Sequence, residues 1–156
     1  MEVARSKTGI VVSQWKYVID LFKEIRMSGC KPTSIPIDPD QKLEDDKEGD
    51  LVNTSQYQRL VGRLIYLSHT QLDIALVMSM VSRFMHLPYE KHLKAIYRIL
   101  RYLKSTLGKG LHFQKTTQQN IKAYTNVDWA SLITDRSTSG YCTYVWGNLV
   151  TQQSKK

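Results

Sequence analysis

The sequence predicts an α+β fold, with helices through most of the first 106 residues and short antiparallel strands near both ends of the chain. Two observations predict it. Between residues 13 and 106, apolar residues recur at spacings of three and four, which is the period of an amphipathic helix. In the first twelve residues, and again after residue 110, β-branched and aromatic residues gather in short runs separated by turn formers, which favours strands.

The chain opens with a predicted β-hairpin, "MEVARSKTGIVVSQ", whose turn lies at Lys7-Thr8-Gly9. Ser13 is the expected cap of a first helix that runs to about Met27 and stops before Gly29. The inner face of this helix is expected to carry Trp15, Val18, Ile19 and Phe22.

A segment rich in proline and charge, from about residue 30 to residue 53, has no amphipathic period and predicts a long irregular loop. Seven of the fourteen acidic residues lie between Asp38 and Asp50, beside only two lysines. The rest of the chain therefore has 20 basic and 7 acidic residues, a net charge of +13 against +8 for the whole chain. A surface this basic attracts polyanions, of which nucleic acid is the commonest inside cells.

Two further helices follow the acidic loop. The first is capped by Asn53, Thr54 or Ser55, and the second begins near Asp73 and ends before Pro88. The apolar face of the first consists of Tyr57, Leu60, Val61, Leu64 and Leu67. That of the second consists of Ile74, Val77, Met78, Val81 and Phe84.

The last predicted helix, residues 89–105, carries an apolar stripe and a separate basic stripe. The apolar stripe, expected to be buried, is Leu93, Ile96, Leu100 and Leu103. The basic stripe has the same spacing of three and four, two residues out of phase with the apolar stripe. It consists of Lys91, Lys94, Arg98 and Arg101. Four cations along one helix face are candidate ligands of successive phosphates and carry no base specificity.

After residue 110 the sequence predicts strands at residues 111–114, 121–127, 140–146 and 149–153. Gly147-Asn148 is the expected tight turn between the last two. Trp129 and Trp146 are expected to be core aromatics of this partial sheet. These strands are expected to leave an apolar face uncovered, whereas the helical part buries its stripes by itself.

The composition is typical of a soluble globular protein, with 42% hydrophobic and 23% charged residues. The longest apolar run, Ala75–Val81, is too short to span a bilayer, and the N-terminus lacks the apolar stretch of a signal peptide. Cys30 and Cys142, with four scattered histidines, form no zinc-binding pattern. The sequence thus predicts an intracellular protein of the cytoplasm or nucleus, without a membrane partner, that is not secreted.

Four segments in the same order resemble the Pol polyprotein of copia-type retrotransposons. They lie within Ser13–Asp38 ("SQWKYVIDLFKE", "GCKP", "PID"), Tyr57–Thr70 ("YQRLVGRLIYLSHT"), His92–Thr106 ("HLKAIYRILRYLKST") and Asp135–Cys142 ("DRSTSGYC"). The resemblance covers essentially the whole chain. It implies that residues 1–114 correspond to the C-terminal part of reverse transcriptase, with a hairpin and a thumb- or connection-like helical bundle. It implies that residues 121–156 are the first strands of an RNase H-like antiparallel sheet.

Most residues that bind magnesium in that family have no counterpart in this sequence. Its polymerase site depends on a Tyr-Val-Asp-Asp-type turn, which does not occur here. Its RNase H site needs about four carboxylates around two metal ions. The first of them falls at Asn126 in "AYTNVDWA", and a neutral amide oxygen binds a hard dication weakly. Asp128 is expected on the same face, but its partner carboxylates belong to segments that follow residue 156 in the family. The resemblance therefore implies a chain that is not an enzyme and binds no metal or other cofactor.

Three functions remain open from the sequence. The first is a non-catalytic remnant, or a gene-model fragment, of the Pol polyprotein. The second is a nucleic-acid-binding module that uses helix 89–105 on an RNA–DNA hybrid or another nucleic acid without sequence specificity. The third is an effector of the RxLR type, through Arg98-Ile99-Leu100-Arg101.

Overall fold

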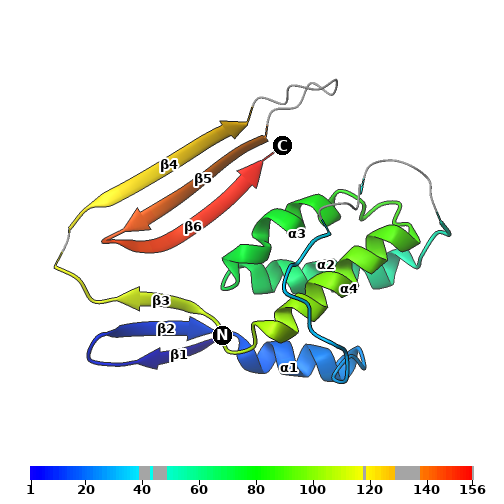
Figure 1. Cartoon of the computed structure of the whole chain (residues 1–156), viewed down its shortest axis with the longest axis horizontal. Coiled ribbons are helices and arrows are strands. Elements are labelled where there is room, and N and C mark those ends of the chain that lie inside the picture. The colour runs from blue at the N-terminus through cyan, green and yellow to red at the C-terminus, as the bar shows by residue number, and fades with distance from the viewer. Residues whose placement is uncertain (39–42, 44–48, 118, 129–137, 156) are drawn as a thin grey trace. The chain divides into compact units, whose positions relative to one another are not determined.

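The computed structural model of the chain describes residues 1–38, 43, 49–117, 119–128 and 138–155 (Figure 1). The chain divides into two compact units. The helical unit spans Gln14–Lys109, and the strand unit combines Met1–Ser13 with Gly110–Lys156. The helical unit is thus an insertion into the strand unit. The proposed division between residues 1–114 and 121–156 stays a prediction, because compactness does not test the ancestry of a segment.

The helical unit contains the predicted helices, and the α+β class is confirmed. Helix α1 spans Trp15–Glu24, α2 spans Thr54–Ser68, and α4 spans Glu90–Ser105. The helix expected to start near Asp73 and end before Pro88 starts as a 3-10 turn, η1 (Leu72–Ile74). It continues as α3 only over Ala75–Ser82, so its last turns are missing. In the described part of residues 30–53 there is no helix or strand, as expected of the loop; an isolated β-bridge pairs Leu51 with Tyr89.

The start of α2 is capped by one of the three predicted candidates, Asn53, but the start of α1 is not capped as predicted. The Asn53 Oδ1 atom accepts a hydrogen bond from the Gln56 backbone N–H at 2.8 Å, which satisfies one of the free donors of the first turn. The prediction that Ser13 caps α1 is wrong, because Ser13 is the last residue of a strand and its hydroxyl donates to Glu2. Gln14 takes the cap position without a side-chain cap bond.

The C-terminal end of α1 also differs from the prediction. The helix ends at Glu24 rather than near Met27, and Gly29 does not form its stop. Arg26 adopts a φ of +57° just after the helix, so a non-glycine residue takes the left-handed conformation there.

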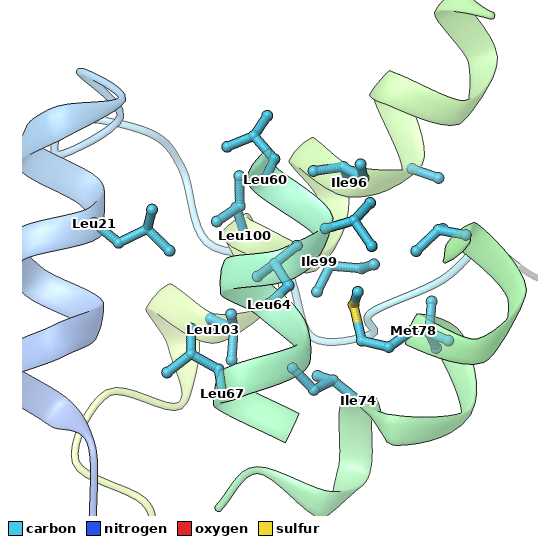
Figure 2. Close-up of a cluster of buried hydrophobic side chains, with 14 of the residues drawn as sticks. Leu21, Leu60, Leu64, Leu67, Ile74, Met78, Ile96, Ile99, Leu100 and Leu103 are labelled. Atoms are coloured by element: carbon cyan, nitrogen blue, oxygen red, sulfur yellow. The ribbon is translucent and has the colours of Figure 1, made fainter. Parts of the chain in front are cut away.

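The hydrophobic core lies in the helical unit, where side chains from all four helices and η1 converge (Figure 2). Helix α2 contributes the five residues predicted for its apolar face, and the α3 region contributes four of its five, with Phe84 only partly buried. On α1, Val18 and Phe22 are buried as predicted, but Trp15 is 49% exposed and Leu21 takes the inward position. The buried apolar set of the unit comprises Val18, Leu21, Phe22, Leu43, Tyr57, Leu60, Val61, Leu64, Leu67, Ile74, Val77, Met78, Val81, Ala95, Ile96, Ile99, Leu100 and Leu103.

The strand unit holds two three-stranded antiparallel sheets. The first sheet has the order β1-β2-β3, with β1 at Glu2–Arg5, β2 at Gly9–Ser13 and β3 at Leu111–Gln114. The second has the order β4-β5-β6, with β4 at Ile121–Asp128, β5 at Thr138–Val145 and β6 at Asn148–Lys155. The predicted strands are therefore confirmed.

The pairing of β2 with β3 joins segments about one hundred residues apart and was not predicted from the sequence. Val12 pairs with Leu111, and Gly9 pairs with Gln114. In chain order the helical unit lies between β2 and β3, so this pairing brings together the two segments that flank it in the sequence. A Cβ at Gly110 would collide with the carbonyl oxygen of Val12, which explains a glycine at this point of close approach.

The turn between β5 and β6 lies one residue earlier than predicted. Val145 pairs with Asn148, so the two turn residues are Trp146 and Gly147 rather than Gly147 and Asn148. Both have positive φ, +53° and +77°, as in a type I′ turn, whose twist matches that of the flanking strands.

The strands remain poorly covered, as expected. Every residue of the strand unit whose burial is described is at best partly buried, and Val3, Ile121, Tyr124 and Trp146 are each more than half exposed. None of the helices that the structure describes is long and apolar enough to cross a membrane.

We expect the core of the helical unit to dominate its stability. Leu64→Ala removes a side chain with no exposure and should lower the free energy of unfolding by about 2–5 kcal/mol, because a cavity remains. Ile65→Ala, on the next residue of α2, removes a side chain of a residue that is 38% exposed and should cost roughly 1 kcal/mol or less. Urea unfolding followed by circular dichroism at the helical band measures both. Equal losses for the two variants would contradict this core.

Candidate nucleic-acid interface

Helix α4 has one face in the core and the opposite face in solvent. Its buried residues are His92, Ala95, Ile96, Ile99, Leu100 and Leu103. The predicted apolar stripe is therefore correct for three residues, whereas Leu93 is only partly buried because it lies at the edge of this arc. The four predicted cations lie on the other side of the helix. With 3.6 residues per turn, their positions fall within an arc of about 80° around the helix axis.

The four cations of the predicted basic stripe differ in their surroundings. Arg101 is exposed. The side chain of Lys94 is 66% exposed, and its ammonium lies 3.1 Å from the carboxylate of Glu90, an exposed pair worth little. Lys91 is partly buried. Arg98 is also partly buried, and its Nη1 atom lies 3.0 Å from Oδ2 of Asp38.

Residues 28–38, which form the start of the long loop, are held along α4. Arg98 pairs with Asp38, and the backbone N–H of Thr33 donates to the carbonyl oxygen of Arg101 at 3.3 Å. Lys104 donates to two carbonyl oxygens of this segment, those of Ser28 at 2.6 Å and Cys30 at 2.7 Å. Arg98 and Lys104 of α4 thus hold residues 28–38 in place. Among the four predicted cations, Lys94 and Arg101 are the exposed ones.

Sequence reasoning did not find the role of Lys104. Lys104 lies outside the predicted rhythm of the basic stripe, and its partners are carbonyl groups more than seventy residues earlier in the chain. Carbonyl partners leave no charge signal in a sequence, so no pattern of acidic residues marks this contact.

Other polar contacts also serve to hold the helices together. Arg63 of α2 forms an ion pair with Glu24 of α1, and this hydrogen bond holds the pKa of the Glu24 carboxyl below its ordinary value. Tyr17 and Tyr66 pack edge-to-face beside it, with ring centroids 5.0 Å apart. These groups fasten α1 to α2.

Two tyrosines are similarly engaged within the helical unit. The Tyr102 hydroxyl donates to Asp73, and burial together with this hydrogen bond raises the pKa of Tyr102 to about 12. The buried hydroxyl of Tyr57 donates to the carbonyl oxygen of Val81 at 2.8 Å, and burial raises the pKa of Tyr57 above its ordinary value. Neither is poised to titrate near neutral pH.

The candidate metal-ligand positions lie on a strand, as predicted. Asn126 and Asp128 both belong to β4, where they pair with Gly140 and Thr138 of β5. Within the residues that the structure describes, no three histidine, cysteine or acidic side chains gather in a way that could hold a metal ion. Asn126 offers a neutral amide oxygen and Asp128 a carboxylate, and a neutral oxygen holds a hard dication more weakly than a charged one.

The RxLR-like tetrapeptide Arg98-Ile99-Leu100-Arg101 lies in the middle of α4. Ile99 and Leu100 have no exposed surface. Its two apolar residues are thus part of the core.

Comparison with known proteins shows the family of this chain. It is 37% identical over 157 aligned positions, covering the whole chain, to the retrovirus-related Pol polyprotein from transposon RE1 of Arabidopsis thaliana. It is 32% identical, again over its whole length, to the Pol polyprotein from transposon RE2 of the same plant. The chain belongs to the copia-type retrotransposon Pol polyproteins. It spans 11% of the length of each of these two relatives.

A third relative carries a different name. The secreted RxLR effector protein 161 of Plasmopara viticola is 37% identical over 102 residues, which cover 64% of this chain and 72% of that protein. No protein-family profile matches the chain, and no solved structure matches it.

The two arginines of the tetrapeptide should differ in their effect on stability. We expect Arg98→Gln to lower the free energy of unfolding by roughly 1 kcal/mol, because it leaves the partly buried Asp38 without this partner. Arg101→Gln should change it by no more than about 0.5 kcal/mol, because its side chain is exposed. Urea unfolding measures both, and Asp38→Asn should add little in the Arg98→Gln background. Additive losses for Arg98 and Asp38 would show that the pair is not coupled.

Proposed function

We propose that the chain is a non-catalytic segment of the reverse transcriptase–RNase H region of a copia-type Pol polyprotein, and that it binds nucleic acid without cleaving it. The observation that carries the binding part is α4, a helix packed on the core that presents Lys94 and Arg101 on its opposite face. Family membership supplies the Pol origin.

The order of the motifs supports the assignment to this region. The hairpin and helical bundle precede the β4-β5-β6 sheet, in the order expected where the end of a reverse transcriptase meets the first strands of an RNase H domain. Strand β4 carries "AYTNVD" at the position of the first RNase H strand in the family.

The lack of catalysis is argued from the chemistry of two motifs. Asn126 occupies the position of the first metal-binding carboxylate, and a neutral amide cannot balance the charge of a dication. The sequence contains no Tyr-Val-Asp-Asp motif for a polymerase site.

The binding would be electrostatic and without sequence specificity. Outside Asp38–Asp50 the chain has 20 basic and 7 acidic residues. Lysine and arginine on an exposed helix face meet phosphate oxygens, which are the same in every sequence. Arg98 contributes less to this surface than the sequence suggested, because its charge is paired with Asp38.

An effector function through Arg98-Ile99-Leu100-Arg101 is less well supported, although one relative is named a secreted RxLR effector protein. A partner reading the tetrapeptide would have to contact Ile99 and Leu100, and both are fully buried. Their exposure would require α4 to leave the core.

We expect the chain not to cleave an RNA–DNA hybrid above the buffer background in the presence of Mg²⁺ or Mn²⁺, because its first ligand position is an amide. A gel assay on an end-labelled hybrid measures this. Asp128→Asn serves as the matched variant. Metal-dependent cleavage by the unaltered chain that Asp128→Asn abolishes would overturn the non-catalytic assignment.

We expect saturable binding to an RNA–DNA hybrid whose affinity falls with salt. The double variant Lys94→Gln with Arg101→Gln should lower the slope of log affinity against log salt by about 2, since each phosphate contact contributes roughly 0.9. Fluorescence anisotropy of a labelled hybrid measures the slope.

The matched control for this experiment is Lys16→Gln with Lys23→Gln, which removes the same charge from α1, where both lysines are exposed. It should change the slope far less. Equal effects of the two double variants would mean that net charge, and not the face of α4, determines binding.

A further inference from the structure

The strand unit contains a hollow that the proposed function does not use. It has a volume of about 680 Å³ and is lined by residues of β1, β2 and β3, the segment after β3, and the hairpin of β5 and β6. This volume lies within the range of about 300–1,000 Å³ that is usual for small-molecule sites. The strands that form it are labelled in Figure 1.

The wall of the hollow is held together by hydrogen bonds. The side-chain amide of Asn148 accepts from the backbone N–H of Gln114 at 2.6 Å and donates to its carbonyl oxygen at 3.0 Å, so it acts like a short piece of strand beside β3. The N–H of Lys115 donates to the carbonyl oxygen of Thr8 at 2.9 Å. The end of β3 is thereby tied both to the first hairpin and to the turn that carries Trp146.

Trp146 lies at this hollow rather than in a core. It is 53% exposed, and its positive φ in the type I′ turn puts it between β5 and β6. The prediction of a core aromatic is therefore wrong for Trp146, because a two-residue hairpin turn has no interior to bury it. The other predicted core aromatic, Trp129, lies outside the described residues.

The chemistry of the lining is apolar and cationic. Phe113, Ile10 and Val150 line the hollow beside Trp146. Arg5 and Lys115 also line it, and the lining includes no carboxylate. Among the residues that the structure describes, neither cation forms an ion pair.

We infer that this hollow binds single-stranded nucleic acid, with an unstacked base against Trp146 and neighbouring phosphates against Arg5 and Lys115. Aromatic side chains accept any base on their face, and cations beside them hold the backbone. A purely apolar ligand would leave both cations without counter-charge. The inference rests on the proposed nucleic-acid binding and deepens it, because it adds a site for single strands that is separate from the duplex-binding face of α4.

The test compares two nucleic acids by fluorescence anisotropy: labelled oligo(dT) of about 12 nucleotides, a length within the usual site size of a single-strand-binding fold, and an RNA–DNA hybrid of equal length. Trp146→Ala should weaken oligo(dT) binding by about fivefold to a hundredfold, since stacking contributes that range per base. Trp146→Tyr should retain most of the affinity. Trp15→Ala, which removes a tryptophan of similar exposure from the helical unit, should have no effect.

The cations are tested by the salt dependence of the same binding. Arg5→Gln with Lys115→Gln should lower the slope for oligo(dT) by about 1.4, since each contact to a single strand contributes roughly 0.7. Lys7→Gln with Lys122→Gln removes the same charge from the strand unit at two residues that do not line this hollow, and should leave the slope unchanged.

The outcomes separate this inference from the proposed function. Hybrid binding that depends on Lys94 and Arg101, without any oligo(dT) binding that depends on Trp146, overturns the inference alone. Oligo(dT) binding that depends on Trp146, without hybrid binding, overturns the role of α4 alone.

Concentration-dependent dimerisation that Trp146→Ala abolishes, with oligo(dT) affinity unchanged, would show that a second copy fills the hollow and would also overturn the inference. If Trp146→Ala fails to fold, the oligo(dT) affinity of Trp146→Tyr and the salt slopes of the two double cation variants test the inference in its place.

Discussion

The packing of α4 against α2 is the interaction on which the rest of the helical unit depends. Ile96, Ile99 and Leu100 are fully buried in one cluster with the apolar face of α2, and α1, η1 and α3 add to the same cluster (Figure 2). Because one face of α4 is committed to this core, the charged residues of the helix must lie on the other. The exposed basic surface and the buried apolar stripe are thus two results of one helical period.

The charges of α4 are divided between structure and solvent. Arg98 and Lys104 hold the segment from Ser28 to Asp38 along the helix, one through a carboxylate and the other through carbonyl oxygens. A cation engaged in this way must lose its partner before it meets a phosphate, which reduces its net contribution to binding. The surface available to a polyanion is therefore smaller than the count of basic residues suggests.

The strand unit is built differently, because the part of it that the structure describes contains no helix. Its apolar and aromatic side chains stay exposed, and some of them line the hollow beside Trp146. Exposed apolar surface of this kind marks an interaction site or an aggregation risk. The two cations in the lining favour an anionic, aromatic ligand over a purely apolar one.

The amino-acid sequence alone predicted the approximate positions of the helices and strands, the inward face of α2, most of that of α3, and the family, and it narrowed the cap of α2 to three residues that include Asn53. The secondary-structure elements and the cap depend on contacts within about four residues along the chain, and the family depends on the order of the motifs. Both can be read directly from the sequence. The three-dimensional fold was needed to show that β3 pairs with β2, that Arg98 forms an ion pair with Asp38 and that Trp146 lines a hollow. Each of these joins residues separated by tens of residues or more, or depends on a turn register that shifts by one residue. Such contacts are selected by chain closure and packing, and local periodicity carries no information about them.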